Sequence, residues 1–332
     1  MHGQVRRGRC QQPRVVRSCA VFALTSSLAL TAGAQETRPG GAATQAATST
    51  AGVDVLERRL YDAVRRAPRD PAARAALGNW LASRGQLKSG SVLLEEARLF
   101  GGSAGAVGAR LQHIYVWLRD WPSLAALPAP PLSPGEKARA AVLAQRATNA
   151  SGTDSTVVPF GAVELGGLGR VPLILGQDTV WAEIDPQEEG VVLPGLARGA
   201  GLVELLGEDR RGPLGVLREV AMGTIVLQNL LVSVDATLPS GRARIGFDVF
   251  AQLAPTVDTK AATVTLHRAG RVIEPPGAAG IPFLLGFPGV SLALRPGEAP
   301  VPIVSPAGRA ALRGKRWTVD LHRGVLWVEP AH

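Results

Sequence analysis

Cysteine and aromatic residues are scarce in this sequence. Only two of its 332 residues are cysteine, Cys10 and Cys19, and aromatic residues make up 5%. Both cysteines lie in the N-terminal leader described below. A chain cleaved after the leader would therefore have no disulfide, no thiol and no cysteine-ligated metal, and its packed core alone would stabilise it. The histidines show no metal-ligand spacing either, so we expect no metal and no cofactor.

Charged residues are also few. They make up 19% of the sequence against 46% hydrophobic residues, so most of the chain can bury a core. The formal net charge is +9, but five arginines and no acidic residue lie in the leader, and subtracting these five leaves +4. No stripe of lysine and arginine with interleaved aromatics is visible, which argues against nucleic-acid binding. The length favours two or three domains.

The leader, positions 1–34, has the pattern of a secretory signal peptide. An arginine-rich start is followed by an apolar run over 19–30 and by Ala32-Gly33-Ala34, a small-x-small cleavage pattern. A retained membrane anchor is the alternative, but the run is shorter than the ~20 apolar residues of a spanning helix. We therefore expect an extracytoplasmic protein, periplasmic or secreted, with no stable membrane span after cleavage. Residues 35–52, rich in Gly, Ala and Thr, predict a disordered linker.

Residues 53–150 have helical periodicity. Val55, Leu56, Leu60 and Val64 fit one helical face that ends at Pro68. Two further helices are predicted, from the N-cap pair Asp70-Pro71 to Gly85 and from Leu87 to Phe100, and the capping-box sequence 133–136 begins another that runs to about Arg146.

This segment resembles tetratricopeptide repeats, which have a period of about 34 residues. Four positions recur at that spacing: Leu77 as Leu111, Leu81 as Tyr115, Gln86 as Asp120, and Leu87 as Trp121. Two repeats are fewer than a free-standing array needs, so we expect the module to pack on the next domain or on a partner. The G-x-S-x-G match at 101–105 falls between two of these helices, which favours a turn rather than a nucleophile elbow.

From residue 157 the pattern becomes that of short strands and turns. We predict strands over 157–163, 171–175 and 180–184, a short helix over 193–202, a turn-rich excursion over 207–215, two strands around 226–227 and 230–234, a turn into a short helix over 243–250, and a closing hairpin of 256–258 with 263–267.

An internal repeat organises this region. VPLILGQDTVWAEID, beginning at Val171, returns as IPFLLGFPGVSLALR, beginning at Ile281. TVDTKAATVTL, beginning at Thr256, returns as TVDLHRGVLWV, beginning at Thr318. The offset in numbering is smaller for the second match than for the first, so the second copy is shorter than the first. What it lacks is the stretch from the 207–215 excursion to Gly246.

These segments resemble a retropepsin-like aspartic peptidase domain. The matching features are VPLIL-G-(Q)-DTVWAEI before Asp185, then VVLPGLARGAGL, the strand pair around Gly223 and Asn229, and IGFDVF followed by VDTKAATVTL. The resemblance implies a multidomain α + all-β chain, in which the helical module precedes a closed β-barrel domain with two lobes, 157–269 and a reduced 270–330. In that family an Asp-Thr/Ser-Gly loop follows the second strand, a flap hairpin covers it, and the segment 245–248 packs beneath.

The chemistry of that family requires two carboxylates that share a proton. In this chain the first loop reads Asp185-Pro186-Gln187, without the hydroxyl and the glycine, and the second copy has Arg295 where the Asp should be. If the lobes pair as in the family, Asp185 faces a guanidinium, which would keep it ionised. On the same pattern Asp248 and Asp258 lie too far from the strand tips to be catalytic.

Several interpretations of this loop remain open. Asp185 could cap nearby backbone amides, form an ion pair with Arg295 between the lobes, or remain catalytic in a dimer of two chains. Gln187 and Glu188 would line the lobe contact, and the carboxylates of 183–189 could attract a cation or form a solvated turn. We therefore expect a peptidase-like protein without activity that binds a peptide or protein through its cleft or its helical module. The alternatives are an active aspartic endopeptidase and a structural envelope protein.

Overall fold

A computed structural model describes most of the chain after residue 54. The described residues are 55–146, 148–161, 168–195, 201–209, 212–268, 272, 274–286, 289–294, 299–321 and 323–329. The predicted signal peptide, the predicted linker and Arg295 lie outside these ranges. No helix within them is long and apolar enough to cross a membrane.

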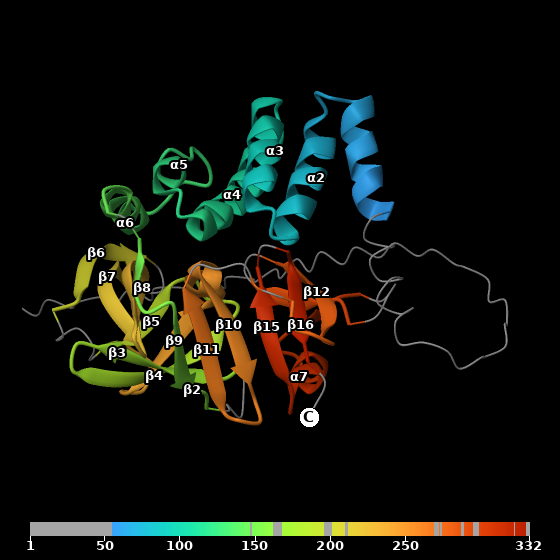
Figure 1. The fold of residues 1–332 in the computed structure, drawn as a ribbon. Helices are drawn as coiled ribbons and strands as arrows, with labels where there is room; N and C mark the ends of the chain where they lie inside the picture. Colours follow the sequence, from blue (N-terminus) through green and yellow to red (C-terminus); the bar gives the residue numbers. More distant parts are fainter. Residues whose placement is uncertain are drawn as a thin grey trace, which may run out of the picture. The chain divides into compact units, whose positions relative to one another are not determined.

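The helical module is present and follows the predicted start signals (Figure 1). Its helices are residues 55–66, α2 (Pro71–Ser83), α3 (Leu87–Leu99), α4 (Ala104–Leu118), α5 (Trp121–Ala125) and α6 (Pro134–Ala144). Asp70 caps α2 by accepting the Ala72 N–H at 2.9 Å, and Ser133 and Glu136 form the predicted capping box of α6. Ser103 of the G-x-S-x-G match is the N-cap of α4, as expected of a turn.

The repeat spacing of this module has a backbone counterpart. Gly85 after α2 has φ +80°, and Arg119 after α4 has φ +57°, so both ends of the spacing are left-handed helix terminations. Whether the helices form tetratricopeptide repeats remains a prediction. The predicted first helix is present, and Val55 and Leu56 on it are each 43% exposed.

Six strands close into a β-barrel, as predicted. In the order β8-β5-β9-β4-β3-β7, each strand is hydrogen-bonded to the next and β7 returns to β8. Alternate residues of β3 and β4 point inward, which places Leu173, Ala182 and Ile184 in the core. The strands are β1 (Ala150–Gly152), β3 (Arg170–Leu175), β4 (Asp178–Asp185), β5 (Val191–Pro194), β6 (Val203–Asp209), β7 (Gly212–Met222), β8 (Ile225–Asp235) and β9 (Arg242–Gly246).

Three details of the barrel differ from the sequence prediction. The excursion over 207–215 is a hairpin of β6 and β7, whose glycines permit a bulge in the β6 register. The two strands predicted over 226–234 are one strand, β8, which continues through Asn229 in a left-handed conformation. Residues 193 and 194 belong to β5 instead of a helix, while 196–200 lie outside the described residues.

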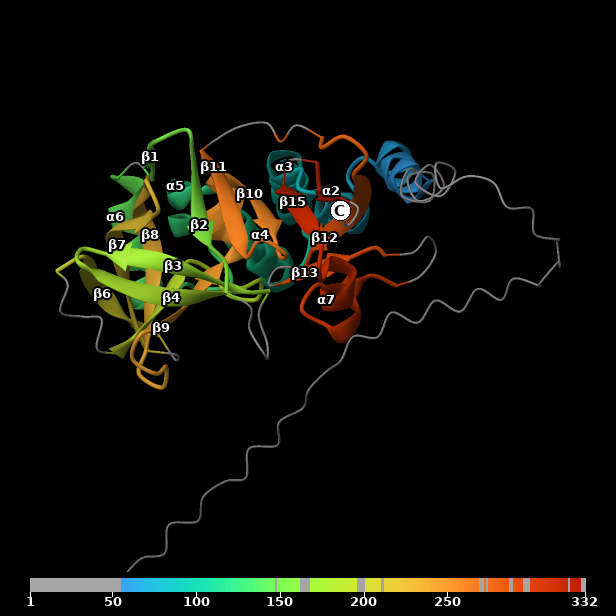
Figure 2. The ribbon, with the colours of Figure 1, turned by 60° about the horizontal axis from the view of Figure 1, so that its bottom comes forward.

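A second sheet joins the two copies of the repeated hairpin (Figure 2). Its order is β14-β13-β12-β16-β15-β10-β11-β2, and β10 pairs with β15 so that Thr256 lies opposite Thr318, its own counterpart in the second copy. The predicted hairpins are therefore both present, and they meet at equivalent residues. The elements are β2 (Ser155–Pro159), β10 (Leu253–Asp258), β11 (Thr263–Arg268), β12 (Ala279–Leu285), β13 (Val290–Leu292), β14 (Val301–Pro302), β15 (Arg316–Asp320) and β16 (Val325–Val328).

The second copy is reduced as its sequence predicts. Between β14 and β15 the described chain contains one element, the helix α7 (Pro306–Leu312). The first copy has β6 to β9 and the 3-10 helix η2 (Phe247–Gln252) in the corresponding stretch. The second copy therefore has no strands with which to close a barrel of its own within the residues described.

The helical module contacts both copies. Arg146 after α6 forms an ion pair with Glu204 of β6 at 2.8 Å, and α6 packs along β6 and β7. Arg110 of α4 donates to the carbonyl of Gly286, after β12, at 2.9 Å. At Gly85 a Cβ atom would clash with the carbonyl of Leu321, so the turn after α2 needs glycine for space as well as for its positive φ. This module, which was predicted to need a packing surface, has one in the β region.

Candidate functional site

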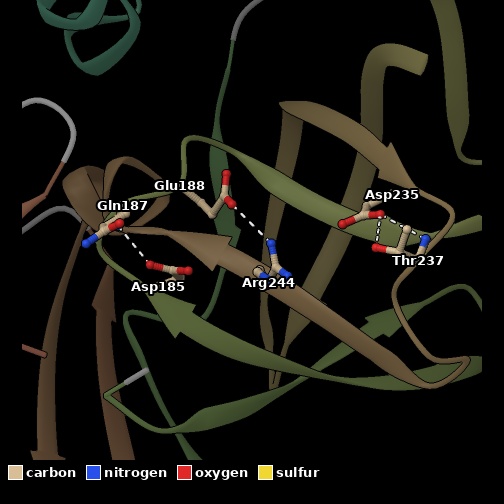
Figure 3. Close-up of polar contacts among 6 residues, drawn as sticks. All are labelled: Asp185, Gln187, Glu188, Asp235, Thr237 and Arg244. Atoms are coloured by element: carbon tan, nitrogen blue, oxygen red, sulfur yellow. Dashed lines mark hydrogen bonds and ion pairs between the residues drawn. The ribbon is translucent and has the colours of Figure 1, made fainter. Parts of the chain in front are cut away.

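Asp185 lies at the end of β4, where the peptidase resemblance would place a catalytic carboxylate. The inward side chain before it, Ile184, is buried, whereas Asp185 is half-buried at the strand end. Its Oδ1 accepts the backbone N–H of Gln187 at 2.9 Å (Figure 3). Pro186 between them is buried and has no N–H to donate. The carboxylate therefore stabilises its own turn, which agrees with the simplest of the expected roles.

The carboxylates near Asp185 have separate partners. Glu188 accepts from the Arg244 guanidinium of β9 at 3.2 Å, and Glu189 lies 2.6 Å from Nδ1 of His113 on α4 (Figure 3 shows the first pair). Glu188 thus has one partner within the barrel, and the expected contact of Gln187 and Glu188 with a second lobe stays a prediction. These carboxylates do not converge, and no group of three or more potential metal ligands occurs among the described residues.

A similar turn ends β8. Asp235 accepts hydrogen bonds from the backbone N–H and the hydroxyl of Thr237, at 2.8 Å and 2.6 Å (Figure 3). The hydroxyl bond, followed by the backbone bond, lowers the pKa of the Asp235 carboxyl below its usual value. Asp185 and Asp235, each at the end of a barrel strand, thus accept hydrogen bonds that stabilise the turns after those strands.

The most perturbed carboxyl of the site is Asp248, in η2 beneath the Asp185 loop. Its Oδ1 accepts the Gly190 N–H at 2.8 Å, and the Gly246 N–H donates to the Gly190 carbonyl at 2.7 Å. Asp248 is 6% exposed, and burial, with the nearby charge of Glu189, raises its pKa to about 7. The segment 245–248 thus packs against the loop, and Asp248 supports it from below.

Two arginines of the helical module lie near this loop and were not singled out from the sequence. Burial lowers the pKa of Arg119 to about 10, against the opposing charge of Asp248. Burial also lowers the pKa of Arg139 on α6, and Glu136 and Glu189 oppose that shift. In the sequence, Arg119 follows a helix and Arg139 lies on an alanine-rich helix. Neither position indicates what the side chain contacts.

The sequence prediction of an Asp185–Arg295 contact is not tested, because Arg295 lies outside the described residues. Within those residues, the Asp185 side chain accepts one hydrogen bond, from the Gln187 N–H. The arrangement can orient a loop and bind polar groups at its surface. It does not display two carboxyls that share a proton.

No protein-family model matches the sequence, and no curated protein matches it significantly. A crystal structure of a retropepsin-like aspartic protease from Rickettsia conorii is among the solved structures that match. It is 11% identical, with a TM-score of 0.26, and the match covers 37% of this chain and 96% of that chain.

Proposed function

We propose that this chain is an extracytoplasmic binding protein built on a peptidase-like barrel, and that it has no aspartic peptidase activity. The observation that carries this proposal is the engagement of Asp185 by the Gln187 amide, in a turn whose middle residue is Pro186. A catalytic Asp of the resembled family needs a second carboxyl beside it. Arg295 at the corresponding position of the second copy argues in the same direction.

The helical module supplies the surface best suited to a protein or peptide partner. Six of the eight exposed large hydrophobic residues in the described chain lie on it: Val55, Leu56, Tyr61, Val92, Leu99 and Phe100. Apolar side chains that one module leaves outside the core are candidates for protein contacts. Leu99 and Phe100, at the end of α3, are 73% and 41% exposed. We infer that an extended or unfolded polypeptide segment binds there.

Two measurements test the proposal separately. For catalysis, unfolded casein is incubated with the full chain between pH 3 and pH 7, and with the Asp185→Asn variant. We expect no cleavage by either protein. Pepstatin-sensitive cleavage that is lost in the variant would overturn the proposal in favour of an active endopeptidase that pairs two chains.

For binding, fluorescence anisotropy follows labelled unfolded casein. We expect Leu99→Glu to weaken binding at least tenfold, because a charge would replace a contact residue that the folded chain does not bury. Val157→Glu is the matched control, since Val157 is 63% exposed but lies on β2. Equal effects of the two substitutions, or no binding by the wild type, would leave the structural-protein alternative.

A further inference from the structure

A cavity of about 90 Å³ lies where the helical module meets the barrel. Its walls come from α4, α5 and α6, from Glu189 in the Asp185 loop and from Leu231 on β8. Since one water needs roughly 10–15 Å³ of such space, the cavity has room for a solute of about six to nine non-hydrogen atoms. It is separate from the exposed surface of α3 and does not depend on the function proposed for that surface.

The cavity contains an arginine whose charge is not neutralised by direct contact. Arg139 lines it and is half-buried, and burial lowers the pKa of its guanidinium. Among the described residues, no hydrogen bond or ion pair to this guanidinium occurs. A guanidinium that faces a cavity without a protein partner can bind an anion there, and its fixed fork of N–H groups matches a carboxylate. Arg139 therefore points to a ligand with a carboxylate group.

The remaining polar groups of the wall exclude a simple anion. Glu136 and Glu189 carry two carboxylates into the same lining, and Glu189 is also bonded to His113 at 2.6 Å. His113 also lines the cavity and is paired with Glu189, so a bare anion would gain attraction mainly from Arg139 and meet repulsion from the glutamates. A ligand that also carries an ammonium group has a partner for both kinds of charge.

The rest of the wall is apolar. Trp121, Leu124 and Leu132 line the cavity beside the charged groups, which suits a short hydrocarbon side chain. We propose that this cavity binds a small zwitterionic α-amino acid, with its carboxylate on Arg139, its ammonium toward Glu136 and Glu189, and a short side chain against the apolar wall. Glycine and alanine are of the size that the volume admits.

The test is isothermal titration calorimetry on the full chain with glycine and L-alanine. We expect saturable binding, and a loss of about tenfold to a hundredfold in affinity in Arg139→Gln, the range for a charge-assisted hydrogen bond. Acetate and methylammonium, which each present one half of the zwitterion, should bind at least tenfold more weakly than alanine. Tryptophan, which is well above the size that the volume admits, should be excluded.

Arg119→Gln is the matched control. Arg119 is also half-buried, and no hydrogen bond or ion pair to its guanidinium occurs in the described chain, but it does not line the cavity. This variant should bind alanine as the wild type does. Circular dichroism and the melting temperature check that each variant folds. If Arg139→Gln does not fold, Arg139→Lys replaces it and should lower affinity at least tenfold.

The proposal would be overturned by no saturable binding of glycine or alanine to the wild type, by unchanged affinity in the folded Arg139 variant, or by acetate binding as tightly as alanine. Equal losses in the Arg119 and Arg139 variants would also overturn it, because they would indicate a general effect of the interface instead of a site at Arg139.

Discussion

The two copies of the repeated β unit share a framework but differ in what surrounds their loops. When the repeated hairpins are aligned, Phe250 of η2 corresponds to Leu312 of α7, and both are buried. Gly246 corresponds to Gly308 in the same alignment, and a Cβ at either would clash with a loop carbonyl, that of Glu188 or of Ile303. The close approach of a helix to the preceding loop is therefore common to both copies.

Among the described residues, polar support of the loop from below occurs in the first copy alone. Asp248 accepts from Gly190, whereas its counterpart in the second copy is the exposed Ala310. The first copy also keeps β6 to β9, which complete the barrel around the loop. The packed framework is therefore present in both copies. The strands β6 to β9 and the carboxyl of Asp248, which surround the loop of the first copy, have no counterpart among the described residues of the second.

The largest predicted effect tests whether the short copy is a packed unit. Phe283 on β12 is 1% exposed and corresponds to Leu173 on β3 in the first copy. Phe283→Ala should lower the free energy of unfolding by about 3–5 kcal/mol, because it leaves a cavity in the core. Urea unfolding followed by tryptophan fluorescence measures it.

The corresponding change in the barrel, Leu173→Ala, should lower the free energy of unfolding by about 2–5 kcal/mol. Phe283→Leu, which introduces the residue of the first copy, should be milder than Phe283→Ala because it keeps most of the apolar volume. A loss below about 1 kcal/mol for Phe283→Ala, less than any buried Phe truncation should cost, would show that the short copy contributes little packing, and would break the comparison.

The second prediction concerns the polar support that distinguishes the copies. Because the pKa of Asp248 is raised to about 7 in the folded chain, from about 4 when unfolded, the protonated carboxyl favours the fold. This stabilisation is complete below about pH 4 and falls by about 1.4 kcal/mol per pH unit until about pH 7. Relative to wild type, Asp248→Asn should remove this slope, since asparagine stays neutral and its oxygen can still accept from Gly190.

Unfolding by urea at pH 4, 5.5, 7 and 8 measures the difference between the two proteins. Ala310→Asn is the control at the corresponding position of the short copy and should change stability by less than about 0.5 kcal/mol at every pH, as expected of an exposed site. Parallel curves for wild type and Asp248→Asn would mean that Asp248 is not the titrating group.

The comparison also shows what sequence can predict. The duplicated strands, the cap at Asp70 and the capping box at Ser133 depend on local patterns, and each was predicted at its observed place. The barrel was predicted through its resemblance to a family. The continuity of β8 through Asn229 was missed, because a left-handed residue inside a strand has no periodic signal.

The candidate site was less predictable for a physical reason. The role of Asp185 in its own turn was one of the expected alternatives, since its partner Gln187 is a near neighbour in the sequence. The surroundings of Asp248, Arg119 and Arg139 depend on burial between elements distant in sequence, and burial alone sets much of their pKa. The pairing of His113 on α4 with Glu189 likewise joins two distant segments and has no local signal.

The smallest predicted effect lies where the two copies meet. Thr256 and Thr318 are 7% and 5% exposed, and their hydroxyl oxygens are 2.9 Å apart, which makes them each other's hydrogen-bond partner. Thr256→Val should lower the free energy of unfolding by about 1–3 kcal/mol, because it leaves the buried Thr318 hydroxyl unpaired. Thr318→Val should act alike, since it leaves the Thr256 hydroxyl in the same position.

The double variant separates a shared bond from two independent ones. It should be closer to wild type than either single variant, because valine has nearly the shape of threonine and no hydroxyl remains to be satisfied. A double-mutant cycle by urea unfolding measures the coupling. Additive losses would mean that each hydroxyl has another partner, and that the equivalence of the copies at their junction is one of backbone pairing alone.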